Sequence, residues 1–233
     1  MSQEIPSHDR VKEIVVSALT AEATVPSDRT GESEYDRASD LLAELSRLGV
    51  SGEIVDVLIE VGAEGRDQVV DWWLRFLSLF DSVRQLSTAD RIRISEALLG
   101  TPPDAPVARA YVLRFLAYSA CPVEWDSLPD SYGIDVIAKA APLELADAYV
   151  WAERFEEAAD QVTSYLKGGG NKEYVESMLD RWTDLEGANV RSDFIETVRR
   201  LLGRSVPTFD EVAAFGRDMR QLASTYKDDL VDA

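Results

Sequence analysis

The stretch RDQVVDWWLRFLSLFDSVRQL, residues 66–86, predicts a long helix whose apolar side chains cover most of its circumference. A helix with one apolar stripe packs on one side, whereas a helix that is apolar nearly all round is buried on several sides. We therefore expect this segment to be the central element of the fold, with Trp72, Trp73 and Phe76 in the core. A docking patch for another protein is the alternative for these three rings.

Helical periodicity continues on both sides of this segment, and no alternating strand pattern competes with it. Glycines and prolines separate the periodic stretches, and short loops between helices favour antiparallel neighbours. The expected fold class is all-α, built from stacked antiparallel helix pairs. The expected helices span residues 9–23, 35–48, 52–61, 66–86, 87–99, 105–120, 134–140, 143–152, 155–167, 172–185, 190–202 and 209–226.

Two polar stretches interrupt the helices. Residues 23–34, ATVPSDRTGESE, contain a proline and a glycine and are expected to form a mobile linker. Residues 121–132, CPVEWDSLPDSY, are the most irregular interior segment. The expected organisation is an N-terminal helix with an acidic linker over residues 1–34, one all-helical domain over residues 35–227 and an acidic tail over residues 228–233.

Charge is the strongest signal in the composition. The chain has 43 acidic and 24 basic residues, a formal net charge of −19. Such a field repels nucleic-acid phosphates and anionic lipids, so we expect no direct nucleic-acid partner and no membrane partner. The acid excess has three open explanations: a salt-rich host or GC-rich genome, a surface that meets a basic partner, or mimicry of nucleic acid.

The N-terminus, MSQEIPSHDRVKEIVV, lacks the basic and apolar regions of a secretory signal. No apolar run approaches the ~18 residues that indicate a membrane span. We therefore expect a cytoplasmic protein.

Few residues offer reactive chemistry. Cys121 is the single cysteine, so it forms no internal disulfide and builds no zinc site alone. His8 is the single histidine, which leaves serine and cysteine nucleophiles without their usual base. We expect no catalytic residues, no metal site and no cofactor.

Two local patterns resemble ligand sites but lack the residues that those sites need. The run GGGNK at 168–172 departs from the phosphate-loop spacing, and a loop with Asn171 as a helix N-cap explains it better. The aspartates between residues 126 and 137 invite a calcium loop. Ser131 and Ile137, however, stand where an EF-hand needs glycine and glutamate.

Residues 145–166, LADAYVWAERFEEAADQVTSYL, resemble a tetratricopeptide (TPR) helix pair. The resemblance rests on small and aromatic residues where paired helices approach closely: Leu145, Ala146, Ala148, Tyr149, Phe155, Ala158 and Leu166. Tyr165 departs from the motif, which prefers a small residue there, and a glycine run replaces the usual proline. The resemblance implies a TPR-like helical array; a HEAT-like array and an irregular multi-helix bundle stay open. Tyr149, Phe155 and Ala158 should be buried between the two helices.

Four residues are candidates for partner binding. A TPR-like register places Asp147, Val150 and Trp151 on the concave face of the hairpin, where such proteins often hold peptides. Packing against the preceding helix is the alternative for Trp151. Trp125 lies in the acidic irregular segment, and it is either a lid on the core or an exposed anchor for a partner.

The expected function is a non-enzymatic helical scaffold or adaptor that binds another protein, which could carry a basic surface. The alternative is an acidic inhibitor or nucleic-acid mimic that occupies the basic cleft of a nucleic-acid-handling protein. Such a mimic needs carboxylates arranged along one face. A third interpretation, an enzyme that uses carboxylates alone, requires four or more inward-facing acids on neighbouring helices.

Overall fold

The computed structural model describes residues 5–21, 33–83, 86–121, 123–184 and 190–203. Within these ranges the chain forms eleven α-helices and two 3₁₀ turns and no β-strand, which confirms the all-α prediction. The helices are α1 (His8–Thr20), α2 (Glu34–Arg47), α3 (Ser51–Glu64), α4 (Val70–Asp81), α5 (Thr88–Gly100), α6 (Pro106–Tyr118), α7 (Ile134–Ala140), α8 (Pro142–Trp151), α9 (Phe155–Lys167), α10 (Lys172–Thr183) and α11 (Ser192–Leu201). The 3₁₀ turns are η1 (Trp125–Ser127) and η2 (Asp130–Tyr132).

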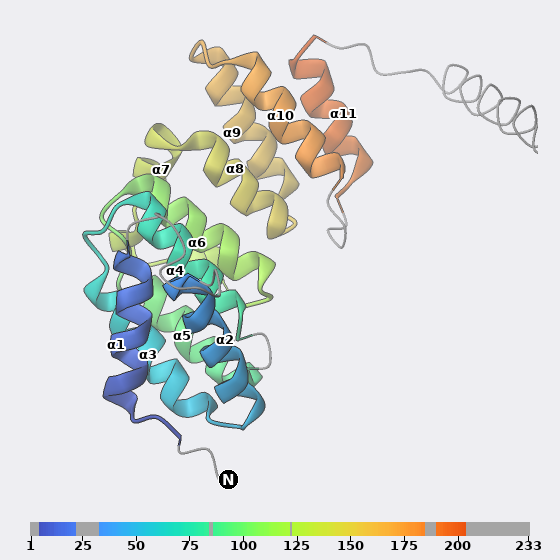
Figure 1. The fold of residues 1–233 in the computed structure, drawn as a ribbon. Coiled ribbons are helices and arrows are strands. Elements are labelled where there is room, and N and C mark those ends of the chain that lie inside the picture. Colours follow the sequence, from blue (N-terminus) through green and yellow to red (C-terminus); the bar gives the residue numbers. More distant parts are fainter. Residues whose placement is uncertain (1–4, 22–32, 84–85, 122, 185–189, 204–233) are drawn as a thin grey trace, which may run out of the picture.

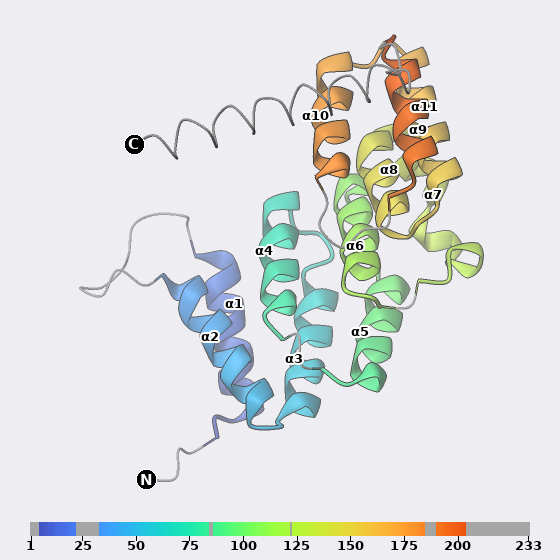
Figure 2. The same cartoon turned by 90° about the vertical axis from the view of Figure 1, so that its right-hand side faces the viewer.

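The helices form an elongated array, with α1–α5 at one end and α9–α11 at the other (Figures 1 and 2). Helix α1 packs against α2, α3 and α4, and α4 in turn packs against α6. Helix α6 packs along α8, and α8 contacts both α9 and α10. The second half of the chain is therefore a series of helix pairs, α6–α7, α8–α9 and α10–α11.

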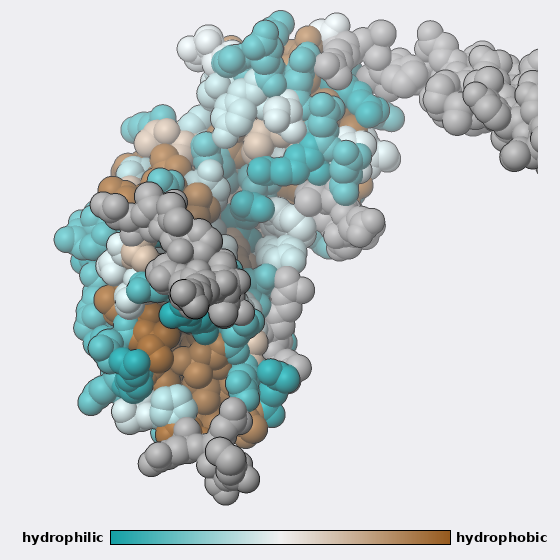
Figure 3. Space-filling view, in the orientation of Figure 1, coloured by the Kyte–Doolittle hydropathy of each residue, from teal (hydrophilic) through white to brown (hydrophobic). Residues whose placement is uncertain are grey.

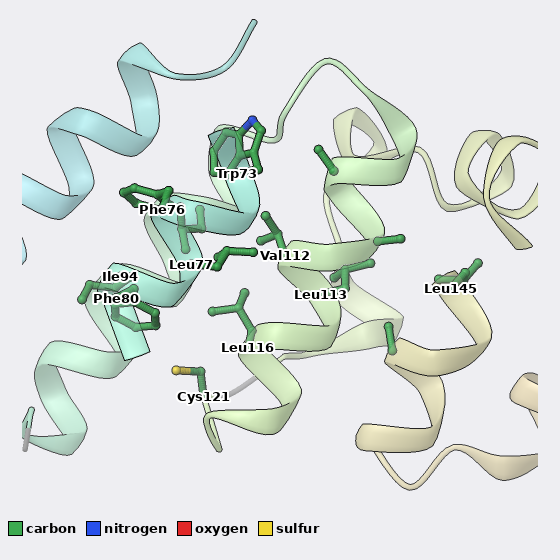
Figure 4. Close-up of a cluster of buried hydrophobic side chains, with 14 of the residues drawn as sticks. Trp73, Phe76, Leu77, Phe80, Ile94, Val112, Leu113, Leu116, Cys121 and Leu145 are labelled. Atoms are coloured by element: carbon green, nitrogen blue, oxygen red, sulfur yellow. The ribbon is translucent and has the colours of Figure 1, made fainter. Parts of the chain in front are cut away.

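The core runs through this array without a break. Around α4, Leu77 points towards α6 and Phe80 packs against Phe115 of that helix, whereas Phe76 points to the opposite side, next to Gly62 of α3 (Figure 4). Trp72, Trp73 and Phe76 are all buried, so the prediction that they belong to the core is confirmed. Three tightly packed rings also stiffen the region, because Trp72 stacks on Phe76 and meets Trp73 edge to face.

The expected single helix over residues 66–86 is wrong in its length. Helix α4 covers only Val70–Asp81, and Val69 before it is extended and 69% exposed. The reason is a tight turn after α3, in which the Gln68 amide donates to the Gly65 carbonyl. Gly65, at the end of α3, lies directly under the Trp72 ring.

Helix α3 also continues past Gly62, where we expected it to end. A β-carbon on Gly62 would lie 3.1 Å from Leu98 and 3.2 Å from Phe76. Glycine therefore serves close packing at this position instead of ending the helix.

The predicted helix starts are confirmed at two N-caps and at one proline in a first turn. The Ser87 side chain accepts the Asp90 amide, the Asn171 side chain accepts the Glu173 amide, and Pro106 is the first residue of α6. The helix expected over residues 209–226, the tail over residues 228–233 and most of the expected linker lie outside the described residues.

Candidate functional site

The TPR-like segment forms the antiparallel hairpin of α8 and α9. Tyr149, Phe155 and Ala158 are buried, as predicted, but Tyr149 packs on Trp125 of η1 and Phe155 on Phe194 of α11, so α8 and α9 alone do not enclose these rings. The chain reverses within residues 152–154, where Glu153 adopts a left-handed conformation and the Arg154 amide donates to the Tyr149 carbonyl. So short a connection holds the two helices against each other.

Two of the predicted concave-face residues do not lie on an open surface. Asp147 is 2% exposed and Val150 is 1% exposed. The physical reason is that α8 has neighbours on several sides, since α6, α9 and α10 all pack against it. The prediction that Asp147 and Val150 face a partner directly is therefore corrected: Val150 is a core residue, and Asp147 lies beneath other side chains.

Asp147 is the centre of a buried polar cluster that joins three helices. Its Oδ1 accepts a hydrogen bond of 2.7 Å from Nε1 of Trp182 on α10. Its Oδ2 lies 2.5 Å from Nη2 of Arg181 on α10 and 2.9 Å from Nε of Arg114 on α6. The Arg114 Nε is close enough for an ion pair but is not aligned for a hydrogen bond. One buried carboxylate is thus compensated by two guanidinium groups and an indole N–H.

Trp151 lies at the edge of the same face. Its ring is half-buried and meets the ring of Tyr118 on α6 edge to face, with the centroids 4.9 Å apart. Its Nε1 is buried without an acceptor. Tyr118 itself is 46% exposed, so the Tyr118–Trp151 pair presents aromatic surface to solvent.

Trp125 packs as a lid and not as a free anchor. Its ring lies 4.8 Å from the Tyr149 ring, and the guanidinium of Arg154 lies 5.7 Å from both rings. Arg154 also pairs with Asp126 at 3.2 Å and with Glu157 at 2.6 Å. These contacts attach η1 to the hairpin, and burial raises the pKa of the Tyr149 hydroxyl.

Three contact layers connect the same side of α6, α8 and α10, which run side by side in Figures 1 and 2. The first layer contains Tyr174, whose hydroxyl donates to Glu144 at 3.1 Å. The second is the Asp147 cluster, and the third is the Tyr118–Trp151 pair. We call this surface the α6–α8–α10 face; it consists of Tyr111, Arg114, Tyr118, Glu144, Asp147, Trp151, Tyr174 and Arg181.

The first layer changes the pKa of Tyr174. Burial, together with the charge and hydrogen bond of Glu144, raises the pKa of Tyr174 to about 12, and Tyr111 adds to the effect. A hydroxyl that keeps its proton remains a donor, so the Tyr174–Glu144 contact persists at neutral pH.

A hollow of about 340 Å³ borders the third layer. It lies between the ends of α4 and α6 and the start of α5, and its lining includes Val83, Leu86, Arg91, Tyr118 and Cys121. Figure 4 shows the Cys121 side chain at the end of α6, directed towards α4. Burial raises the pKa of this thiol, so it acts as an apolar wall and not as a nucleophile.

Six residues of this face were not anticipated from the sequence: Tyr111, Arg114, Tyr118, Glu144, Tyr174 and Arg181. For Arg114 and Tyr118, the sequence contains a signal in the spacing between each residue and its partner. Arg114 and Tyr118 precede their partners Asp147 and Trp151 by the same offset of 33 positions. A constant offset of this size is typical of stacked helix pairs. It escapes a motif search because the paired residues differ in type.

Among the described residues, no group of three or more His, Cys, Asp or Glu side chains could hold a metal ion. No helix in the described part of the chain is long and apolar enough to cross a membrane. No protein-family model, curated protein or solved structure matches this chain.

Proposed function

We propose that this protein is a non-enzymatic helical adaptor that binds a segment of another protein on the α6–α8–α10 face. One observation carries the proposal: three neighbouring helices present partly exposed tyrosine, tryptophan and arginine side chains on one continuous surface. These three residue types dominate the energetic centres of protein interfaces.

Rigidity supports the same proposal. The exposed side chains are held by contacts between helices: Arg114 and Arg181 by Asp147, Tyr174 by Glu144, and Tyr118 by Trp151. Side chains that are ordered before binding lose less conformational entropy when a partner arrives. The face is therefore suited to bind a partner and not only to stabilise the fold.

The acids of α3 favour an adaptor over a nucleic-acid mimic. Glu53, Asp56, Glu60 and Glu64 follow one side of α3, as a mimic would require. However, Arg93 pairs with Asp56, and Lys12 pairs with Glu60 and Glu64. A row of four carboxylates that two cations half neutralise imitates a phosphate backbone less well.

The surface in Figure 3 has a more hydrophobic part and a more hydrophilic part. In this view hydrophobic residues gather over the N-terminal helices, and hydrophilic residues cover most of α8–α11. The C-terminal helix pairs thus offer a polar surface interrupted by aromatic rings, which is typical of recognition surfaces that bind reversibly.

The test compares proteins captured from the native host by three forms of the chain. Tyr118→Ser removes an exposed ring from the face, whereas Leu48→Ser removes an exposed apolar side chain from the turn between α2 and α3 at the other end of the array. We expect one or more partners to be retained by wild type and Leu48→Ser but lost by Tyr118→Ser. Trp151→Ala is less suitable, because its ring is more buried than that of Tyr118 and its removal would leave a cavity.

Capture that is insensitive to Tyr118→Ser, with both variants folded by circular dichroism, would show that partners bind elsewhere. The absence of any specific partner would remove the proposal altogether.

A further inference from the structure

At the centre of the α6–α8–α10 face, two guanidinium groups share one buried carboxylate. We infer that Arg114 and Arg181, positioned by Asp147, bind a carboxylate of the partner segment, and that the hollow beside Tyr118 takes an apolar side chain of the same segment. The inference rests on the proposed function and names the chemistry of its ligand.

Elsewhere in the described chain, ion pairs join one cation to one acid, as in Arg66–Asp104 and Arg93–Asp56, or one cation to two acids. Lys12 pairs with both Glu60 and Glu64, and Arg154 pairs with both Asp126 and Glu157. At the centre of the face the ratio is reversed, because two guanidinium groups share the single carboxylate of Asp147, which also accepts the Trp182 indole N–H. The cluster therefore has one positive charge in excess, in a protein whose net charge is −19.

The two guanidinium groups also keep free donors. An arginine has five N–H groups, and Asp147 engages Nη2 of Arg181 and Nε of Arg114. The remaining N–H groups of both side chains have no acceptor among the described residues, and the side chains of Arg181 and Arg114 are 44% and 33% exposed. A planar fork of donors matches the two oxygens of a carboxylate, which is the ligand that we assign to this position.

The groups next to the two arginines determine how the partner segment is oriented and how many acids it can carry. Glu144 lies one turn before Asp147 on α8 and repels a second carboxylate on that side. On the other side lie the Tyr118–Trp151 pair and the hollow. The face therefore selects one acid next to an apolar side chain and disfavours an acidic run. A polyphosphate chain is disfavoured as well, because the net charge of −19 repels it.

Helix geometry sets the spacing between the acid and the apolar residue of the bound segment. Arg114 and Tyr118 are four residues apart on α6, a rise of ~6 Å. An extended peptide covers ~3.3 Å per residue, so the apolar side chain should follow or precede the acid by about two or three positions.

The experiment is a selection of random peptides displayed on phage against the full chain, followed by titration of the enriched peptides. We expect an Asp or Glu two or three positions from a Leu, Phe or other large apolar residue. Arg181→Gln should weaken these peptides by about tenfold or more, the loss expected for a charge-assisted hydrogen bond. Arg181→Lys, which keeps the charge but not the fork, should give an intermediate loss.

Two further variants separate binding from folding. Arg93→Gln removes a similarly exposed, ion-paired arginine from α5 and should leave peptide affinity unchanged. Asp147→Asn removes the charge that holds both guanidinium groups while its amide oxygen can still accept the Trp182 N–H, so it should weaken the acidic peptides. Thermal melting of each variant checks that it is folded, and an Asp147 without a positioning role would leave peptide affinity unchanged in a folded variant.

The outcomes distinguish the inference from the proposed function. Enriched peptides that lack acids, or that bind Arg181→Gln as tightly as wild type, would overturn the carboxylate inference and leave the adaptor proposal standing if Tyr118→Ser still weakens them. If no peptide is enriched, or if the enriched peptides ignore both Arg181→Gln and Tyr118→Ser, the face is not a peptide platform and both proposals fail.

Discussion

Two non-glycine residues close the helices that bear the Tyr118–Trp151 pair. Ala120 follows Tyr118 with φ 52°, and Glu153 follows Trp151 with φ 58°. In both turns the next amide donates back to the helix, from Cys121 to Leu116 and from Arg154 to Tyr149. Glycine takes the equivalent position after other helices of this chain, for example at Gly49 and Gly169. Backbone strain therefore lies two residues beyond each ring of the exposed aromatic pair.

Relief of this strain should stabilise the protein. A left-handed conformation costs an L-residue ~1–2 kcal/mol, and the entropy of glycine offsets part of that, so Glu153→Gly should raise the free energy of unfolding by about 0.5–1 kcal/mol. Glu96→Gly, at an exposed position inside α5, should instead lower it by ~0.5–1 kcal/mol. Urea denaturation measures both. Equal effects of the two substitutions would contradict the strain at Glu153.

Tyr174 should make the fold sensitive to alkali. Its pKa is raised from 10.0 to about 12, so the unfolded chain loses this proton first as the pH rises. The contribution of Tyr174 to stability is complete below pH ~10 and is lost between pH ~10 and pH ~12. We expect a smaller loss of stability over this window in Tyr174→Phe than in wild type, measured by urea denaturation at several pH values. An identical loss in both proteins would show that Tyr174 titrates normally.

At the scale of elements, the junction between α3 and α4 depends on the absence of one β-carbon. A β-carbon on Gly65 would lie 2.0 Å from the Trp72 ring, which has no room to move because it stacks on Phe76. The φ of Gly65 is −81°, so the backbone itself does not require glycine. Close packing alone selects the residue, and this packing separates α3 from α4 at the turn.

Gly65→Ala should therefore destabilise the protein by ~1–3 kcal/mol, the usual cost of an overpacked core. Gly52→Ala lies in the first turn of the same helix with no atom near its β-carbon, and it should be neutral or slightly stabilising. Chemical denaturation of the two variants gives the comparison. A neutral Gly65→Ala would mean that the Trp72 ring can move aside at little cost.

At the scale of the whole molecule, repulsion between like charges opposes folding. The net charge of −19 is the excess that remains after every basic residue is counted against an acid, so ion pairs do not reduce it. The described ion pairs lie mainly at exposed positions, where each contributes little. Salt screens this repulsion over a Debye length that falls from ~10 Å at 0.1 M to ~3 Å at 1 M.

Raising KCl from about 0.05 M to about 1 M should therefore increase the melting temperature. The same series in sucrose controls for effects of solute other than screening. A flat or falling response to KCl would show that local ion pairs, such as those of Lys12 with Glu60 and Glu64, outweigh the general repulsion.

Much of the secondary structure follows from local chemistry, which the sequence displays directly. Helices α7 and α9 have the predicted limits, and Ser87, Asn171 and Pro106 start helices where expected. Caps, prolines and the 3.6-residue period act within a few residues, so they are visible without a structure. The burial of Tyr149, Phe155 and Ala158 was predictable for a similar reason, because small and aromatic residues at these spacings indicate a packed hairpin.

The composition of the face was decided by tertiary structure alone. Sequence patterns placed Asp147 and Val150 on an open surface, yet α6 and α10 cover them, and the neighbours of a helix depend on how distant segments stack. Arg114, Tyr118 and Arg181 come together with α8 across gaps of about thirty residues, with no shared local motif. Local spacing determines which residues lie on one side of a helix, whereas packing between helices determines whether that side meets solvent, a neighbour or a buried charge.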